Sequence, residues 1–168
     1  MFIKMIMVQS LNGIVNQKDR KKWNSKEDFD YLKSEIEKSD SLIISRETFI
    51  LNKKLYESKP CLILNKHFEK IEGYLIYSFY SKENITNFIK KNKYKRTLLL
   101  GGPTINTFLL NDGLIDEISL TIEPVVFNGK KNIFDNENIK DKKFFTIKEI
   151  KKINQNSFLT VYAKKWSL

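Results

Sequence analysis

The chain has 168 residues, of which 41% are hydrophobic and 12% aromatic, and this suits one compact domain spanning residues 1–168. The same composition excludes a disordered, collagen-like or coiled-coil protein. The formal net charge of +10 is compatible with a nucleic-acid, membrane or phosphate-bearing partner; however, only three of the 30 basic residues are arginines, and a lysine-rich composition without any binding role explains it equally well.

Strands alternate with helices in the first two thirds of the hydrophobic pattern. Short apolar runs predict buried strands, and apolar residues at helical spacing, such as Phe29, Leu32 and Ile36, predict amphipathic helices. In chain order, we expect strands at 2–8, 41–45, 60–64, 74–77 and 97–100. We expect helices at 26–38, with Ser25 as N-cap, at about 47–57, at 82–91, and from 103 to the stop signal Asp112-Gly113.

From Glu117 onward the pattern becomes strand-like, and we expect strands at 118–122, 125–127, 144–150 and 158–164. Pro124 follows Glu123 directly, which indicates a sheet edge or a bulge at this point. The element order predicts an α/β fold whose mixed sheet is mostly parallel, gains antiparallel strands at the C-terminal end, and is flanked by helices.

The cysteine and histidine content limits the cellular compartments and the disulfide and metal chemistry that we expect. Cys61 is the single cysteine, so no intrachain disulfide can form, and its apolar neighbours favour a buried structural thiol. His67 is the single histidine, which excludes the usual zinc sites, and we predict no bound metal. No segment approaches the roughly 18 apolar residues of a membrane helix. We therefore expect a cytoplasmic protein without a membrane partner.

The carboxyl ends of parallel strands form the edge where such sheets bind ligands. This rule predicts that residues 8–13, 45–48, 65–67 and 101–104 lie along one edge. Gly101-Gly102-Pro103-Thr104 joins a strand to a helix, so its backbone N–H groups could hold a phosphate or pyrophosphate. A tight turn with nothing bound is the alternative. The segment is neither a dinucleotide fingerprint nor a P-loop.

Two further segments carry residues suited to ligand binding. Arg46, which follows a predicted strand, can grip a phosphate with two hydrogen bonds, and Thr48 can assist; a surface arginine and a helix cap are the alternative. Trp23 and Asp28 place an aromatic ring and a carboxylate at the start of a helix. That carboxylate can hold the N–H edge of a pteridine or pyrimidine, or it can simply complement the helix dipole.

Taken together, these segments resemble the dihydrofolate reductase-like superfamily, and within it the reductase domain of the bacterial riboflavin-biosynthesis deaminase-reductase. The resemblance covers residue 2 to about 135 and rests on an ordered set of short segments. They are Ser10-Leu11-Asn12-Gly13, Trp23-x-Ser25-x-x-Asp28, Ser45-Arg46-x-Thr48, Leu99-Leu100-Gly101-Gly102 and the run from Ile115 to Pro124.

The resemblance implies NADPH as cofactor and assigns residues to it. The glycine turn matches the pyrophosphate site, Arg46 and Thr48 match the phosphate-holding element, and the loop after the first strand matches the one over the nicotinamide. The implied cofactor-binding residues are Val8, Gly13, Ile14, Arg46, Thr48, Asn65, Lys66, Gly101, Gly102, Pro103, Thr104 and Ile105.

The resemblance also implies a heterocyclic small-molecule substrate, which is phosphorylated in the riboflavin-type reaction, and a homodimer. Trp23, Ser25, Asp28, Thr121 and Glu123 are the implied substrate-binding residues, with Asp28 and Asn12 as the catalytic pair. Asn12 stands where the riboflavin reductases have Asp, Ser45 where the family has Gly, and Ile105 where dihydrofolate reductases have Tyr.

Four functional readings follow from these observations. The first is 5-amino-6-(5-phosphoribosylamino)uracil reductase, for which the loop residues Arg20–Lys22 could take the substrate phosphate. The second is dihydrofolate reductase, and the third is a reductase-like fold without activity. The fourth, a basic nucleic-acid-binding domain, is disfavoured because the lysines are spread along the chain and no binding motif is present.

Overall fold

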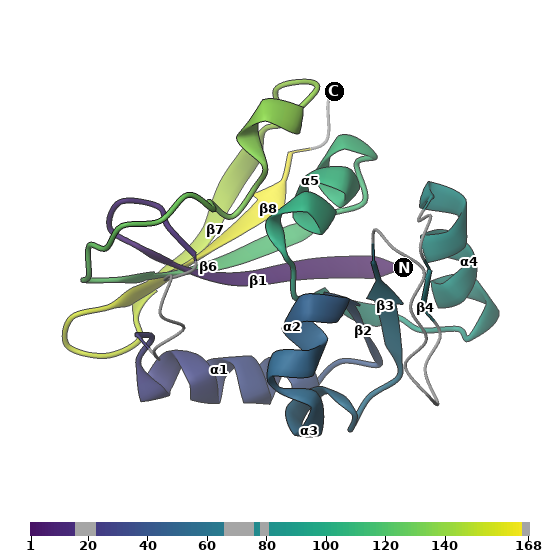
Figure 1. Cartoon of the computed structure of the whole chain (residues 1–168), viewed down its shortest axis with the longest axis horizontal. Coiled ribbons are helices and arrows are strands. Elements are labelled where there is room, and N and C mark those ends of the chain that lie inside the picture. The colour runs from purple at the N-terminus through teal and green to yellow at the C-terminus, as the bar shows by residue number, and fades with distance from the viewer. Residues whose placement is uncertain (16–22, 66–75, 78–80, 166–168) are drawn as a thin grey trace.

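The computed structural model describes residues 1–15, 23–65, 76–77 and 81–165, and within them eight strands form one sheet in the order β4-β3-β2-β5-β1-β6-β8-β7 (Figure 1). The strands are β1 (Phe2–Ser10), β2 (Ser41–Ser45), β3 (Cys61–Leu64), β4 (Ile76–Tyr77), β5 (Arg96–Leu99), β6 (Glu117–Glu123), β7 (Phe145–Lys152) and β8 (Phe158–Lys164). The helices are α1 (Lys26–Glu37), α2 (Arg46–Leu51), α3 (Lys53–Tyr56), α4 (Lys82–Lys91) and α5 (Pro103–Asn111), with a short 3₁₀ turn η1 (Asn136–Asn138).

The sheet is mixed, as the sequence predicts. β1 pairs in parallel with β5 and β6, and β2 pairs in parallel with β3 and β5. β8 runs antiparallel to both β6 and β7. Because parallel neighbours need crossover connections, the helices lie on the faces of the sheet, and the predicted fold class is confirmed.

Helices cover both faces of the sheet and create two apolar layers (Figure 1). On one face, Ile85 and Ile89 of α4 and Leu109 of α5 are fully buried. On the other face, Ile36 of α1 and Phe49 of α2 belong to the second layer. Fully burying side chains of this size contributes about 1.5–3 kcal/mol each. These layers fix the strand ends that carry the candidate site.

The predicted strand at 125–127 is wrong. β6 ends at Glu123, and Pro124 has no N–H with which to extend the pairing. The Val125 N–H bonds the Glu123 carbonyl at 2.8 Å, and the Val125 carbonyl accepts the Leu11 N–H at 2.9 Å. The chain therefore leaves the sheet here and runs beside the loop that follows β1.

The predicted helix at about 47–57 is interrupted. Asn52 adopts non-helical backbone angles, φ −141° and ψ 46°, and separates α2 from α3. The last hairpin also starts one residue later than predicted, and its register shifts between Ile147 and Glu149, where β7 bulges against β8.

The predicted buried thiol is confirmed. Cys61 is 7% exposed, and its Sγ donates to the carbonyls of Tyr56 and Lys59 at 3.3 and 3.2 Å. Burial raises the pKa of this thiol to about 12, so it stays protonated at neutral pH.

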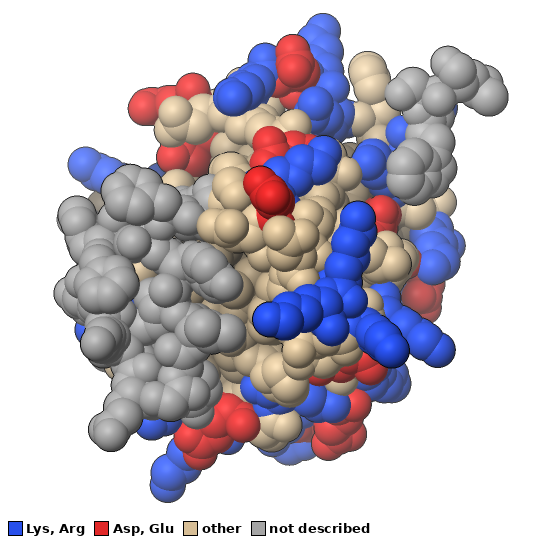
Figure 2. Space-filling model, turned by 90° about the vertical axis from the view of Figure 1, so that its right-hand side faces the viewer, with Lys and Arg blue, Asp and Glu red and all other residues tan. Residues whose placement is uncertain are grey.

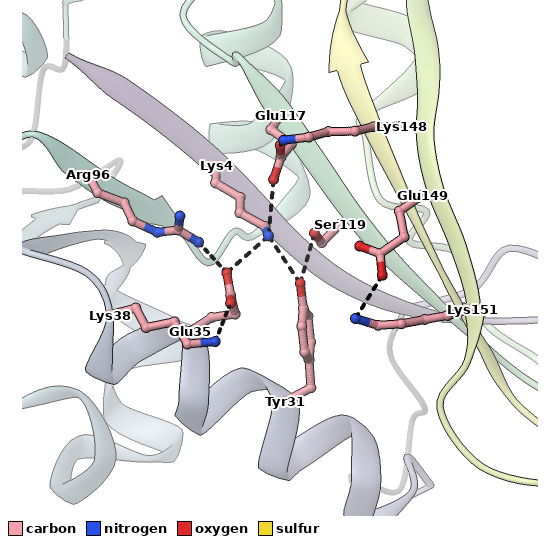
Figure 3. A network of polar contacts seen from close by, with 10 residues as sticks. All are labelled: Lys4, Tyr31, Glu35, Lys38, Arg96, Glu117, Ser119, Lys148, Glu149 and Lys151. Carbon is pink, nitrogen blue, oxygen red and sulfur yellow. Dashed lines mark hydrogen bonds and ion pairs between the residues drawn. The ribbon is translucent and has the colours of Figure 1, made fainter.

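A buried ionic network links α1 to the sheet (Figure 3). Lys4 of β1 is 5% exposed, and its Nζ lies 3.0 Å from carboxylate oxygens of both Glu35 and Glu117. The same ammonium donates to the Tyr31 hydroxyl at 3.1 Å, which in turn donates to the Ser119 hydroxyl. The network thereby buries Glu35 of α1 beside the apolar Ile36.

Further cations surround the two carboxylates of this network. Arg96 and Lys38 pair with Glu35, and the Lys148 Nζ lies 2.7 Å from Glu117. Burial works to raise the pKa values of both carboxyls, but these cations and Lys4 outweigh it and hold both below their usual range.

The surface charge is dispersed over the face drawn in Figure 2. Lys and Arg side chains there stand among acidic and uncharged ones, and they do not form one continuous basic surface over the described atoms. Among the described residues, no helix is both long enough and apolar enough to span a bilayer.

Candidate functional site

A cavity of about 720 Å³ lies at the carboxyl ends of β2, β3 and β5. It brings together six of the predicted cofactor residues with others from the chain that follows β6. The lining residues are Ser45, Arg46, Glu47, Leu64, Asn65, Gly102, Pro103, Thr104, Ile105, Lys130, Lys131, Asn132, Phe134, Asp135, Asn136 and Glu137. We call this the phosphate-side cavity, because a helix N-terminus and three cations converge on it.

The glycine turn has the local geometry that its sequence predicts. Gly101 has φ +83°, a region that disfavours side chains, and a Cβ added there would also meet the Met7 Sδ at 3.4 Å. The peptide bond between Gly101 and Gly102 is cis. Gly102 is the N-cap of α5 and Pro103 its first residue, so the first turn of a nine-residue helix lines this cavity.

Ser45 connects the glycine turn to α2. Its N–H donates to the Gly101 carbonyl at 2.6 Å, and its hydroxyl accepts the Thr48 N–H at 3.1 Å as the cap of α2. The same hydroxyl donates to the Thr48 Oγ1 at 2.8 Å. Thr48 is therefore engaged in capping and lies outside the cavity lining, whereas Arg46 lines it.

The wall formed by residues 130–137 was not anticipated from the sequence. Side chains of α5 hold it in place, because Asn106 Nδ2 donates to the Ile133 carbonyl at 2.8 Å and Thr107 Oγ1 accepts the Asp135 N–H at 2.7 Å. The sequence offers one signal for this wall, because Asn106 and Thr107 are polar residues within an apolar helix. The structure buries both of them fully. This wall adds Lys130 and Lys131 to the cavity.

A second cavity, of about 670 Å³, lies between the start of α1, the end of β6 and the turn between β7 and β8. Its lining residues are Trp23, Asn24, Ser25, Glu27, Glu123, Pro124, Val125, Ile153, Asn154, Gln155, Asn156 and Ser157. We call this the carboxylate-side cavity. Trp23, Ser25 and Glu123 were predicted to bind substrate, whereas the turn 153–157 was not, although its polar composition indicates a turn.

Asp28 and Thr121 lie behind this lining. The Asp28 side chain is in the first turn of α1, is 5% exposed, and accepts a hydrogen bond from Asn24 Nδ2 at 2.9 Å. Burial raises the pKa of Asp28; contacts with Asn24 and Thr121 oppose this rise, and the negative charge of Glu123 adds to it. Asp28 is thus a carboxyl that holds a proton more readily than usual.

Glu123 is the other buried carboxylate of this region, and it is 4% exposed. Its Oε1 accepts from the Ser25 N–H at 2.8 Å and from the Ser25 hydroxyl at 2.6 Å. Its Oε2 accepts from the Ser157 hydroxyl. Glu123 therefore ties the N-cap of α1 and the start of β8 to the end of β6.

The loop after β1 lies outside the linings of both cavities. Gly13 has φ +78°, and Asn12 is exposed, with its Nδ2 donating to the Phe127 carbonyl at 3.1 Å. The Ser10 hydroxyl donates to the Asn12 Oδ1 at 2.8 Å. Val8 and Ile14, also predicted cofactor residues, are in neither lining. In strand order, however, β1 stands between β5 and β6, so its end lies between the two cavities.

Some predicted site residues lie outside the described residues. They are Lys66 and His67 of the predicted cofactor edge and Arg20, Lys21 and Lys22 of the predicted substrate loop.

The comparison with known families identifies one match. A sequence model of the RibD C-terminal domain matches residues 57–159. The uncharacterised protein YyaP of Bacillus subtilis is 33% identical over 81 residues, which is 48% of this chain and 43% of YyaP. The chain thus spans less than half the length of this curated relative.

Solved structures share the fold over nearly the whole chain. A putative riboflavin biosynthesis protein from Shewanella sp. PV-4 aligns with a TM-score of 0.81 at 20% identity, covering 99% of this chain and 100% of that one. Dihydrofolate reductase from Enterococcus faecalis, complexed with NADP(H) and RAB-propyl, aligns with a TM-score of 0.67 at 19% identity, covering 97% of this chain and 96% of that one. Both alignments show the dihydrofolate reductase-like fold.

Proposed function

The chain belongs to the RibD C-terminal domain family, and we propose that it is an NADPH-dependent reductase of riboflavin biosynthesis that acts on 5-amino-6-(5-phosphoribosylamino)uracil. The observation that carries this proposal is the placement of the two cavities. They open at the same edge of the sheet on either side of the end of β1, one suited to phosphates and the other holding a buried acid.

The residues of the phosphate-side cavity fit the phosphates of NADPH. The Gly101–Gly102 turn has no side chain that would keep a pyrophosphate from the backbone, and α5 presents its N-terminus there. Arg46, Lys130 and Lys131 bring positive charge to the lining, and Glu47, Asp135 and Glu137 balance it in number. Lys131 pairs with Glu47 at 3.8 Å, so Arg46 is the cation on which the phosphate role depends. When bound, NADPH supplies the hydride; the chain's part is to hold and orient it.

The residues of the carboxylate-side cavity suit a planar heterocycle with N–H groups. Trp23 offers an aromatic wall, and its ring meets Phe127 edge-on at 5.0 Å between centroids. Addition of hydride to C1′ of the ring-opened ribosylamino group leaves the attached nitrogen in need of a proton. Asp28, with its raised pKa, is the described group suited to supply it.

Dihydrofolate reduction is the second candidate, and one observation favours it. Thr121 lies beside Asp28, as expected if the pair holds a pterin ring. The same carboxyl would then assist protonation of the pterin rather than of a ribosylamino nitrogen.

NADPH oxidation followed at 340 nm tests the proposal. With the phosphoribosylamino-pyrimidine as substrate, we expect turnover, and with dihydrofolate, none. Turnover with dihydrofolate alone would assign the second function. Failure to bind NADPH in a calorimetric titration would refute both reductase proposals and leave a fold without this activity.

Arg46→Ala is expected to weaken NADPH binding about tenfold or more, because a charge-assisted hydrogen bond to phosphate contributes about 1.5–3 kcal/mol. NADH, which lacks the 2′-phosphate, should lose less than this. Calorimetric titration of both nucleotides measures the difference, with Lys54→Ala, which removes an exposed charge outside the cavity, as the control. An equal loss for both nucleotides would refute a 2′-phosphate role.

The homodimer remains a proposal, and the outer strand of the described sheet supports it. β7 is last in the strand order and exposes Ile147 and Ile150 at 61% and 60%. Antiparallel pairing of two β7 strands about a twofold axis would place Lys148 opposite Glu149 and Ile147 opposite Ile150. Light scattering should give about 40 kDa, twice the 19.9 kDa of one chain, and a monomer mass would refute it.

A further inference from the structure

Two buried carboxyls belong to this region, Glu123 in the lining of the carboxylate-side cavity and Asp28 behind it, and their hydrogen-bond partners differ. Glu123, at the end of β6, uses both oxygens to accept bonds from Ser25 and Ser157. Asp28, in α1, accepts a side-chain hydrogen bond from Asn24 at Oδ2 and lies beside Thr121. Glu123 and Asp28 therefore have different environments and can have different roles.

The hydrogen bonds of Glu123 join three separate elements. Ser25 caps α1, Ser157 precedes β8, and Glu123 itself ends β6. Three donors from two serines thus meet on one carboxylate. Three hydrogen bonds from the protein already use both Glu123 oxygens, so this carboxylate holds Ser25 and Ser157 in place and has at most about one of its four acceptor sites left for a ligand.

Burial is the main cause of the raised pKa of Asp28, and the charge that adds to it belongs to Glu123 of β6. Among the described groups, Glu123 is the charge that acts on Asp28 and favours its protonated form. Glu27, on the same turn of α1, is exposed and accepts from Asn154 Nδ2 at 3.4 Å, and the Lys151 ammonium of β7 lies over Tyr31, one turn further along the helix. No group of opposite charge is described in contact with the Asp28 carboxyl.

We propose that Glu123 is a positioning residue and not a substrate ligand: it fixes the start of α1 through Ser25 and places its carboxylate beside Asp28. This inference rests on the proposed function, in which Asp28 supplies the proton. It reassigns Glu123, which the family resemblance places among the substrate-binding residues.

Glu123→Gln removes the negative charge but keeps the size and shape of the side chain. The amide oxygen can still accept from Ser25, and the amide nitrogen can donate to the Ser157 hydroxyl, which accepts as well as donates. The negative charge beside Asp28 is lost, so the Asp28 carboxyl should release its proton at lower pH than in the wild type.

Titration of the Asp28 side-chain carbon by ¹³C NMR, in the protein without substrate or cofactor, measures this shift directly. We expect the midpoint to move to lower pH in Glu123→Gln and to stay at the wild-type value in Glu27→Gln, which removes an exposed charge from the same turn. An unmoved midpoint in Glu123→Gln, or an equal movement in the control, would overturn the proposal. Should Glu123→Gln fail to fold, Glu123→Ser removes the same charge and leaves room for water.

Kinetics distinguish a positioning residue from a substrate ligand. In Glu123→Gln, the alkaline limb of the kcat profile should move to lower pH while KM stays within about twofold of the wild type. A large rise in KM with an unmoved profile would make Glu123 a substrate ligand instead. If the NMR midpoint moves but neither substrate is reduced, the proposed function fails while the role of Glu123 beside Asp28 stands.

Discussion

Replacing Lys4 by methionine is expected to lower the free energy of unfolding by about 3 kcal/mol, because removing one partner of a buried ion pair leaves the others uncompensated. Glu35 and Glu117 are 4% and 5% exposed, and the Lys4 ammonium lies between them. Methionine matches the length and the apolar stem of lysine, so packing changes little. The loss of unfolding free energy therefore measures the effect of removing the charge.

The remaining cations limit this loss but do not remove it. Arg96 and Lys38 still face Glu35, and Lys148 still faces Glu117, but none of them bridges the two carboxylates. Lys26→Met is the matched control, since Lys26 pairs with Asp30 where their side chains are 81% and 45% exposed. Such surface pairs contribute about 0–1 kcal/mol. Urea unfolding of both variants measures the difference, and equal losses would contradict a special role for the buried network.

The pH dependence of stability gives a second measurement on the same network. The pKa values of Glu35 and Glu117 lie below the ordinary 4.5, so their contribution is complete above that pH and is lost as pH falls through the folded values. Burial works to lower the pKa of Lys4, but Tyr31, Glu35 and Glu117 raise it above 10.5, so its contribution is lost only at higher pH. The gap between wild type and Lys4→Met should therefore narrow below pH 4.5.

Asp28→Asn is expected to reduce kcat for the accepted substrate by about 10²–10⁴, the range in which a positioned general acid contributes. Asparagine keeps the shape and the acceptor oxygen that faces Asn24, but it has no transferable proton. The Kd of NADPH should stay unchanged, because the residue lies at the carboxylate-side cavity. Single-turnover oxidation of bound NADPH measures the chemical step.

Asp30→Asn, two residues along α1 and half exposed, is the matched control for the loss of one acidic charge. Its rate should match the wild type. An Asp28→Asn enzyme as fast as the wild type would remove this carboxyl from the reaction, and the proton would have to come from solvent.

Local chemistry explains which parts of the site were predictable. Ser25 caps α1 as its sequence predicts, and its hydroxyl accepts the Asp28 N–H at 3.2 Å. Gly101, Gly102 and Pro103 form the predicted turn because glycine tolerates positive φ and proline suits the first helical position. In each case, neighbouring residues in the chain determine the geometry.

What the sequence could not predict depends on contacts between distant segments. The wall at 130–137 is held by Asn106 and Thr107, and nothing local indicates that these side chains reach a loop more than 25 residues away. Lys4 interrupts an apolar strand, and the partners that neutralise its charge lie 31 and 113 residues later in the chain. The wrongly predicted strand at 125–127 has a local cause. The hydrophobic pattern continues past Pro124, but the proline ends the strand pairing at Glu123.

The protonated state of Cys61 has a practical consequence for work on this protein. Alkylating reagents attack thiolates, and a buried thiol with a pKa of about 12 offers almost none at neutral pH. Because no second cysteine competes with it, modification of the chain records only those moments when β3 and its neighbouring helices separate. The rate at which Cys61 is alkylated therefore measures how often the half of the sheet that carries the phosphate-side cavity opens.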